Sequence, residues 1–279
     1  MRLETGVPGF DEMLGGGLPS GRLTVVAGEP GSGIHLLIYN LVWNALEGGL
    51  SVLYFALESP PAEMVKIGEE LGKEVERARE EGRLKIMDGF SVRTGIAVAA
   101  VGEYLDGVEP RRFWEVIRMN EPDLVVVDST YPVHGSDPEA MAKTVAVLKA
   151  SAMHMEIPVV TGDPVEVLDV PGVNMVDVLL RMEVHDLNGV MVSALTPLKL
   201  VPPTLPRFRV PVTVSPEGDV IVHTDRVLDV HEGEIRDADS YVVEELGGVP
   251  AEVAEEVADS DFLEDLDVDL DLDDLEDID

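Results

Sequence analysis

The chain has 279 residues, with 55 acidic against 20 basic side chains and a formal charge of -35 at neutral pH. Such acidity argues against direct binding of DNA or RNA, because binding to phosphates needs basic side chains. The sequence contains no cysteine, which excludes disulfides, cysteine-bound zinc and thiol nucleophiles.

Hydrophobic residues make up 45% of the chain, enough for the core of one large domain. Near Met1 there is no basic segment followed by an apolar run, and no stretch approaches the roughly 20 apolar residues that span a bilayer. We therefore expect a cytoplasmic protein that makes no contact with a membrane.

Strands and helices alternate along the first part of the chain. Apolar runs typical of strands covered on both faces occur at residues 23–27, 51–56, 84–87, 124–128 and 157–161. Apolar residues recur every three or four positions over 62–81 and again over about 138–154, which predicts two helices. This alternation predicts an α/β fold with a mostly parallel central sheet flanked by helices.

Beyond residue 177 the pattern changes to strands, predicted at 178–184, 190–198, 207–214 and 220–223. Turn signals lie between them at 187–189 and 216–219. Antiparallel hairpins are therefore expected in this part of the chain.

The end of the chain has its own composition. Residues 252–279 hold 15 acidic side chains and no basic one, and aspartate alternates with Val268, Leu270 and Leu272. Because like charges repel, one interpretation is a disordered, solvated tail. The other is an acidic and apolar segment that docks on an unknown protein partner or on a basic patch of its own chain.

The strand predicted at 23–27 is followed by Gly28-Glu29-Pro30-Gly31-Ser32-Gly33-Ile34-His35, which opens an apolar helix. Glycines allow consecutive backbone N–H groups to point into one concavity, and a helix N-terminus adds partial positive charge, so this arrangement suits a phosphate. The spacing fits the phosphate-binding loop G-x-x-x-x-G-K-[ST] except at its last two places. The competing interpretation is a turn kept for its backbone geometry alone. The candidate nucleotide-binding residues are Gly28, Glu29, Gly31, Ser32, Gly33, Ile34 and His35.

Two substitutions weaken the chemistry of this loop. Ile34 stands where a lysine would reach the β- and γ-phosphates, and His35 stands where a hydroxyl would bind magnesium. Phosphoryl transfer needs positioned cations, and Mg²⁺ prefers oxygen ligands to imidazole. We therefore expect that any bound ATP is not turned over efficiently and that Mg²⁺ is poorly held.

The run TGVPGFDEMLGGGLPSG at residues 5–21 resembles the opening of the KaiC-like ATPases of the RecA superfamily, and the resemblance extends to about residue 222. It implies a RecA-like P-loop fold. The strand before Glu58 resembles the family strand that ends in an acidic pair acting on the attacking water, although Ser59 replaces the second acid. The strand ending at Asp128 is similar to the one whose aspartate holds the magnesium shell. The plain alternatives are an exposed carboxylate for Glu58 and a turn cap with Ser129 for Asp128.

The later strands resemble the hairpins through which one subunit of this family reaches its neighbour's nucleotide. The resemblance places Lys199, Arg207 and Arg209 on these hairpins, with Val201 where an arginine is expected. It implies association with further copies or with an active relative. Surface ion pairs, or an anchor for the acidic tail, are the alternatives for these three cations.

We predict a RecA/KaiC-like domain at residues 1–224, an extension without assigned structure at 225–250 and an acidic, disordered tail at 251–279.

The expected function is a nucleotide-binding or purely structural regulatory module, for example in signal transduction. One alternative is an active ATPase that uses Lys199 or a neighbouring subunit's cation. Another is a recombinase-like accessory protein. The six histidines show no metal-binding spacing.

Overall fold

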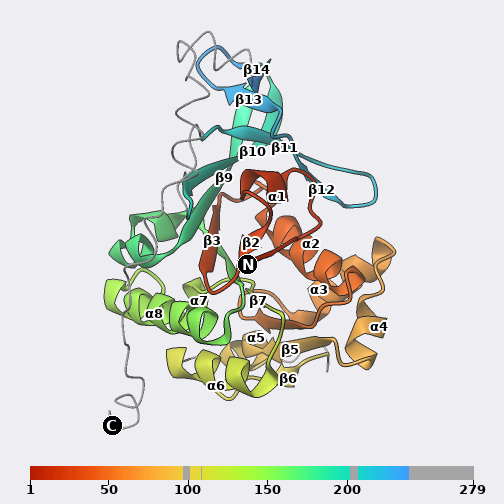
Figure 1. Cartoon of the computed structure of the whole chain (residues 1–279), viewed down its shortest axis with the longest axis vertical. Coiled ribbons are helices and arrows are strands. Elements are labelled where there is room, and N and C mark those ends of the chain that lie inside the picture. Colours follow the sequence, from red (N-terminus) through yellow and green to blue (C-terminus); the bar gives the residue numbers. More distant parts are fainter. Residues whose placement is uncertain (97–100, 108, 202–206, 239–279) are drawn as a thin grey trace. The chain divides into compact units, whose positions relative to one another are not determined.

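A computed structural model describes residues 1–96, 101–107, 109–201 and 207–238. Its main sheet contains parallel strands β3 (Leu23–Gly28), β4 (Val52–Ala56), β5 (Leu84–Asp88), β6 (Glu103–Tyr104), β7 (Leu124–Val127), β8 (Val159–Pro164) and β9 (Val178–Leu187). Antiparallel strands β10 (Val190–Lys199), β11 (Val210–Val214) and β12 (Val220–Val222) continue it beyond β9. The order is β12-β11-β10-β9-β3-β8-β7-β4-β5-β6 (Figure 1). The prediction of a mostly parallel sheet with C-terminal antiparallel strands is confirmed.

Two small sheets accompany the main one. Strands β1 (Arg2–Leu3) and β2 (Leu18–Pro19) pair near the N-terminus, and β13 (Arg226–Asp229) pairs with β14 (Glu234–Asp237). The β13–β14 hairpin falls in the extension that had no assigned structure. The tail predicted at 251–279 lies outside the described residues.

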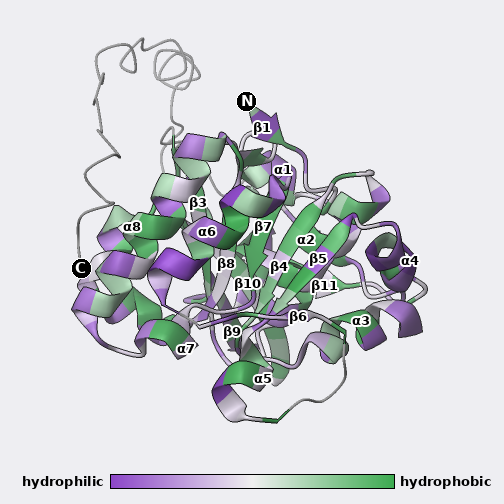
Figure 2. Ribbon diagram, turned by 90° about the horizontal axis from the view of Figure 1, so that it is seen from below, coloured by the Kyte–Doolittle hydropathy of each residue, from purple (hydrophilic) through white to green (hydrophobic). Residues whose placement is uncertain are grey.

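Helices cover both faces of the main sheet. The α-helices are α1 (Phe10–Met13), α2 (Ile34–Glu47), α3 (Pro61–Glu70), α4 (Val75–Glu80), α5 (Gly89–Thr94), α6 (Pro110–Asn120), α7 (Tyr131–His134) and α8 (Pro138–Met155), with 3-10 helices η1 (Val165–Asp169) and η2 (Pro171–Met175). One apolar cluster joins the strands to α2, α3 and α4, and a second joins them to α6 and α8. The strands are accordingly among the most hydrophobic segments (Figure 2). Within the described ranges, no helix is both long and apolar enough to span a membrane.

The prediction of a single helix over 62–81 is wrong, because the chain forms the two helices α3 and α4 there. Gly72 follows the end of α3 with φ at +77°, a left-handed conformation that interrupts a right-handed helix and favours glycine. The apolar periodicity continues across the break, since both helices bury their apolar side chains against the same core.

The glycine-rich N-terminal run fastens the beginning of the chain to β12. Gly9 has φ at +74°, and a Cβ added to it would lie 1.8 Å from the carbonyl oxygen of Val222. The N–H of Val222 donates to the carbonyl of Pro8 at 2.9 Å. Glycine at position 9 is therefore required both by backbone conformation and by the close approach of β12.

A buried amide ties α2 to the turn between β11 and β12. The Nδ2 of Asn40 donates to the carbonyls of Leu36 at 2.9 Å and Gly218 at 3.0 Å, and its Oδ1 accepts the N–H of Val220 at 3.1 Å. All of these groups are removed from water or nearly so, which makes the bonds costly to break. The helix that follows the glycine loop is thereby fixed against the C-terminal strands.

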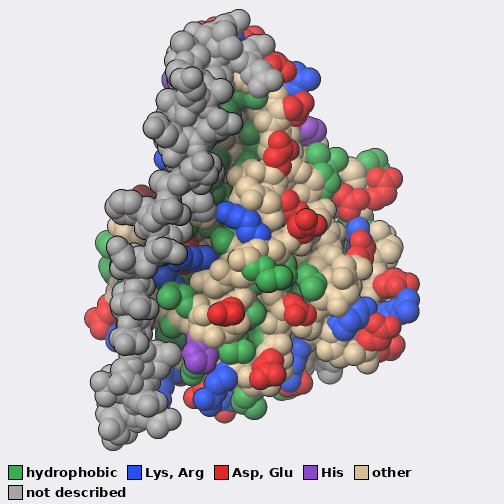
Figure 3. Space-filling model, viewed as in Figure 1, with side chains coloured by type: hydrophobic (Ala, Val, Ile, Leu, Met, Phe, Trp, Pro, Cys, Tyr) green, Lys and Arg blue, Asp and Glu red, His purple; other side chains and the backbone are tan. Residues whose placement is uncertain are grey.

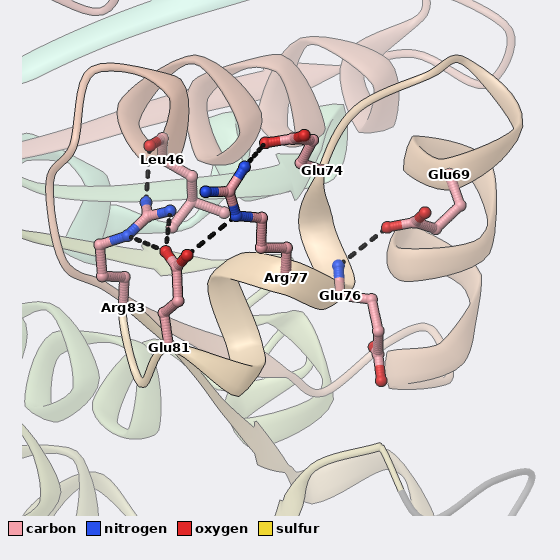
Figure 4. Close-up of polar contacts among 7 residues, drawn as sticks. All are labelled: Leu46, Glu69, Glu74, Glu76, Arg77, Glu81 and Arg83. Atoms are coloured by element: carbon pink, nitrogen blue, oxygen red, sulfur yellow. Dashed lines mark hydrogen bonds and ion pairs between the residues drawn. The ribbon is translucent and has the colours of Figure 1, made fainter.

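Ion pairs within and just after α4 hold Arg83 in place, and Arg83 connects this segment to the end of α2 by a hydrogen bond (Figure 4). Arg77 pairs with Glu74 and Glu81, both at 2.9 Å, and Arg83 pairs with Glu81 at 2.8 Å. Arg83 also donates to the carbonyl of Leu46 at 2.7 Å. A cavity of about 350 Å³ lies beside this network. Arg77 and Arg83, which border the cavity, already have carboxylate partners.

Gly9→Ala is expected to lower the free energy of unfolding by roughly 2–5 kcal/mol, the sum of left-handed strain and a steric clash. Gly72→Ala is the matched control, since Gly72 has nearly the same φ, +77°, with no atom near the added Cβ. The control should lose only about 1–2 kcal/mol from strain. Urea unfolding measures both values, and equal losses would show that the contact with Val222 is unimportant.

Candidate functional site

The glycine loop connects β3 to α2 at the carboxyl edge of the parallel strands. Gly31 and Gly33 have φ at +83° and +90°, which lets the chain turn sharply before α2 begins at Ile34. The N–H of Ser32 donates to the carbonyl of Glu29 at 3.1 Å. The Ser32 side chain is 1% exposed and its hydroxyl has no hydrogen-bond partner.

A cavity of about 660 Å³ lies over this loop. It is lined by predicted site residues and by parts of α2, α3 and the end of β8: Gly28, Glu29, Pro30, Gly31, Gly33, Ile34, His35, Leu36, Tyr39, Glu58, Glu63, Ile67, Gly162, Asp163 and Pro164. The structure thus places Glu58 and the glycine loop along the same cavity. Ser32 and Asp128 are absent from this lining.

The walls of the cavity are acidic. Glu29, Glu58, Glu63 and Asp163 contribute carboxyl groups, and no lysine or arginine occurs among the described residues that line it. The exposed imidazole of His35 is the lining group that could carry positive charge. A phosphate here would depend on backbone N–H groups and the start of α2.

Ile34 belongs to the apolar core. Its side chain is 8% exposed and packs with the cluster around α2. A Cβ added to Gly28 would lie 2.7 Å from the Cβ of Ile34. Glycine at position 28 therefore accommodates Ile34, and the side chain at the lysine position is an internal packing element.

Glu29 ties the loop to β9. Its backbone N–H donates to the carbonyl of Met182 at 2.9 Å, and its Oε2 accepts the N–H of Val184 at 3.2 Å. Its Oε1 lies 3.6 Å from a guanidinium nitrogen of Arg181. Arg181 was not among the predicted site residues, although it occurs in the run that resembles a family strand.

Asp128 is 1% exposed, and backbone groups occupy both of its oxygens. It accepts N–H groups from Leu57 at 2.8 Å, Glu58 at 3.0 Å, Ser59 at 3.0 Å and Ser129 at 2.7 Å. Burial raises the pKa of Asp128 to about 7, against the opposing effect of these donors. The carboxyl group therefore joins the chain after β4 to the chain after β7.

Asp163, at the end of β8, is a second buried carboxylate that sequence reasoning missed. Its Oδ1 accepts the N–H of Thr130 at 2.6 Å and the hydroxyl of Thr130 at 2.8 Å, and its Oδ2 accepts the hydroxyl of Thr161 at 2.7 Å. The available signal was its position directly after a predicted parallel strand, where polar groups from neighbouring strands meet.

The three predicted hairpin cations lie away from the cavity of their own chain. Lys199 pairs in register with Leu179 near the start of β9, and its Nζ donates to the carbonyl of Asn174 at 3.1 Å. The glycine loop, by contrast, meets β9 at Met182.

The two arginines make contacts near β10 and β9. Arg207 donates to the carbonyl of Leu198, and the Nε of Arg209 lies 3.4 Å from the carboxylate of Glu183. Across the described residues, no group of three or more histidine, aspartate or glutamate side chains is arranged to hold a metal ion.

Replacing the carboxyl of Asp128 should alter how stability depends on pH. Because its folded-state pKa is raised from 3.8 to about 7, the folded state keeps a proton that the unfolded state releases. The contribution to stability is therefore present below about pH 4 and is lost as the pH rises to about 7. Between about pH 5 and 7, the free energy of unfolding of the wild type should fall up to about 1.4 kcal/mol per pH unit more steeply than that of Asp128→Asn.

Urea unfolding over this pH range measures the two slopes. Asp106→Asn is the control for general loss of negative charge, because the Asp106 side chain is 94% exposed. If Asp128→Asn keeps the same slope as the wild type, the raised pKa is wrong.

Comparisons with known proteins give the family. The family model described as the KaiC ATPase matches residues 3–161, more than half of the chain. A UPF0273 protein of Pyrococcus furiosus is 29% identical over 239 residues, covering 81% of this chain and 96% of the relative. A UPF0273 protein of Thermotoga maritima is 27% identical, covering 79% and 95%. The crystal structure of a KaiC-like protein from Pyrococcus horikoshii matches with a TM-score of 0.62 at 17% identity, over 80% of this chain and 99% of that one. The chain therefore belongs to the KaiC family of ATPases, with a RecA-like fold, and this membership implies nucleotide binding.

Proposed function

We propose that this KaiC-family chain holds nucleotide at the β3–α2 loop without hydrolysing it efficiently and works as a regulatory or interaction module. The observation that carries the proposal is the position of Ile34, which packs into the apolar core where the loop pattern calls for a lysine. Family membership supports the nucleotide site, and the packing of Ile34 supports the loss of turnover.

The charges of the side chains that line the cavity also support the proposed loss of turnover. Two like charges about 4 Å apart near a protein surface repel each other by roughly 4 kcal/mol. Glu58 and Glu63 border the cavity, so a triphosphate that approaches them meets repulsion that no lining lysine or arginine offsets within the described residues. Charge that spreads over the transferring phosphoryl oxygens would lack its usual stabilisation.

The residues present do not fit the magnesium ion that family chemistry uses. His35 replaces the hydroxyl ligand with a nitrogen ligand, and Mg²⁺ prefers oxygen. The oxygens of Asp128 already accept backbone N–H groups from both neighbouring loops. Using Asp128 for a metal shell would require those bonds to be given up.

An active ATPase with a substitute cation is the alternative. Within one chain Lys199 is bound to the carbonyl of Asn174, so this alternative needs a cation from a neighbouring subunit. We therefore include association with further copies, or with an active relative, in the proposal. A recombinase-like accessory role would act through protein partners, because the net charge of -35 opposes direct contact with DNA.

The double variant Ile34→Lys with His35→Thr tests the proposal. We expect no ATP turnover by the wild type above background in concentrated KCl, and no strengthening of ATP binding by Mg²⁺ in calorimetry. The double variant should bind ATP roughly tenfold more tightly with Mg²⁺ present, because it gains a cation and an oxygen ligand.

The matched control is Ile34→Met with His35→Thr, which restores the hydroxyl but not the charge. It should behave like the wild type in the ATP measurements. Thermal melts establish that each variant is folded. Wild-type ATP turnover clearly above background would contradict the proposal.

A further inference from the structure

Three side chains of α6 that the nucleotide cavity does not use lie on one flank of the helix. Arg111, Trp114 and Arg118 follow one another at intervals of three and four positions, so they line up along the helix. The helix buries Phe113 and Ile117 against the core and leaves Arg111 and Arg118 exposed. We call Arg111, Trp114 and Arg118 the α6 stripe.

The α6 stripe borders α8. The two helices lie side by side over the same face of the main sheet (Figure 2). The ring of Trp114 meets the imidazole of His154 with the ring centroids 5.0 Å apart and an angle of 71° between the planes. Trp114 is half-buried, and Met153, beside His154, is 48% exposed. The stripe therefore presents an aromatic ring, supported by α8, between two exposed guanidinium groups.

The guanidinium groups of the α6 stripe have no carboxylate partners. Within the described residues, the side chains of Arg111 and Arg118 make no ion pair and no hydrogen bond, whereas the adjacent Arg112 pairs with Asp106 and Glu115. Arg111 and Arg118 are the only described arginines without either kind of contact. This is unexpected in a chain with 55 acidic and 20 basic side chains. The stripe is therefore a local excess of positive charge that the chain itself leaves unneutralised across its described part.

The charge around the stripe differs from the charge of the rest of the visible surface. Acidic side chains are spread over the face drawn in Figure 3, while basic side chains and a histidine lie close together over α6 and α8. A partner that carries carboxylates is repelled by acidic surface and attracted by the stripe, so charge alone directs it there. DNA and RNA fit less well, because neutralising their closely spaced phosphates takes more cations than two arginines.

The composition and spacing of the stripe define the partner that it fits. Tryptophan and arginine are the residues that most often carry the binding energy of protein interfaces. Arg118 follows Arg111 by seven positions, which is roughly 10 Å along a helix. A matching segment places two carboxylates about 10 Å apart and an apolar side chain between them. The carboxylates can then accept charge-assisted hydrogen bonds from both guanidinium groups.

We propose that the α6 stripe is a docking site for an acidic segment of a partner protein, in which two carboxylates bracket an apolar side chain. The carboxylates pair with Arg111 and Arg118, and the apolar side chain packs on Trp114 beside His154. These residues are not among those that line the cavity over the glycine loop. Docking therefore holds whether or not the function proposed above is correct.

A fluorescein-labelled helical peptide tests the docking. The peptide is alanine-based and carries two glutamates seven places apart with a leucine midway between them, and the control peptide has glutamines in place of the glutamates. Fluorescence anisotropy with the full chain in about 0.1 M KCl, where charges act over roughly 10 Å, measures both affinities. We expect the acidic peptide to bind roughly tenfold more tightly than the control peptide. Replacing its leucine by glutamine should weaken binding by a similar factor, because the contact with Trp114 is lost.

The matching variants change the protein. Arg111→Gln with Arg118→Gln should weaken binding of the acidic peptide roughly tenfold. Lys66→Gln with Arg226→Gln removes the same charge from other elements, where these side chains are 78% and 49% exposed, and should leave the affinity unchanged. Thermal melts establish that each variant is folded.

The proposal is overturned if the glutamine peptide binds as well as the acidic peptide, or if the control pair of variants weakens binding as much as the arginine pair does. Tighter binding of a single-stranded oligonucleotide than of the acidic peptide would overturn it in favour of a nucleic-acid partner. Sedimentation of the chain alone completes the test. Self-association that Arg111→Gln with Arg118→Gln abolishes would show that a second copy occupies the stripe, and would equally overturn the proposal.

Discussion

The carboxyl group of Asp128 holds together the edge of the sheet on which the site is built. It collects backbone N–H groups from three successive residues after β4 and from Ser129 after β7. Asp163 fastens the chain around Thr130 from the neighbouring strand β8 in the same way. The loops that border the cavity are therefore positioned by buried carboxylates bonded to backbone, and the position of Glu58 follows from the bond that its own N–H makes to Asp128.

This use of Asp128 limits what the cavity can do. A carboxyl group that is buried and has a pKa raised to about 7 is a weak source of negative charge for a metal shell at neutral pH. Ile34 adds an apolar wall, and its packing against Gly28 makes the loop part of the core. The features that stabilise this edge of the sheet, the bonds of Asp128 and the packing of Ile34, are thus the same ones on which the proposed loss of ATP turnover rests.

The sequence was sufficient to predict the strands of the main sheet, but it was not sufficient to predict all the side-chain contacts at the carboxyl edge of that sheet. Continuous apolar runs located β3, β4, β5, β7 and β8 to within a few residues, because both faces of each strand are covered. Periodicity failed at Gly72, since it records which side chains are buried but not whether the backbone between them stays helical. The loop from Gly28 to His35 could be located from glycine spacing. Asp163 and Arg181 could not be assigned, because the contacts of Asp163 with Thr130 and of Arg181 with Glu29 join residues that are far apart in the sequence.

Arg181 links the glycine loop to Glu183 and, through it, to Arg209. One guanidinium nitrogen lies 3.6 Å from Glu29 of the loop and 2.9 Å from Glu183, and Glu183 in turn pairs with Arg209. Glu29, Arg181, Glu183 and Arg209 therefore form a continuous row of alternating charge across β9. The Nε of Arg181 has no hydrogen-bond partner, so the contacts with Glu29 and Glu183 do not use every donor that the guanidinium group offers. The glycine loop is therefore tied to β9 both by the ion pair between Glu29 and Arg181 and by the backbone bond from Glu29 to Met182.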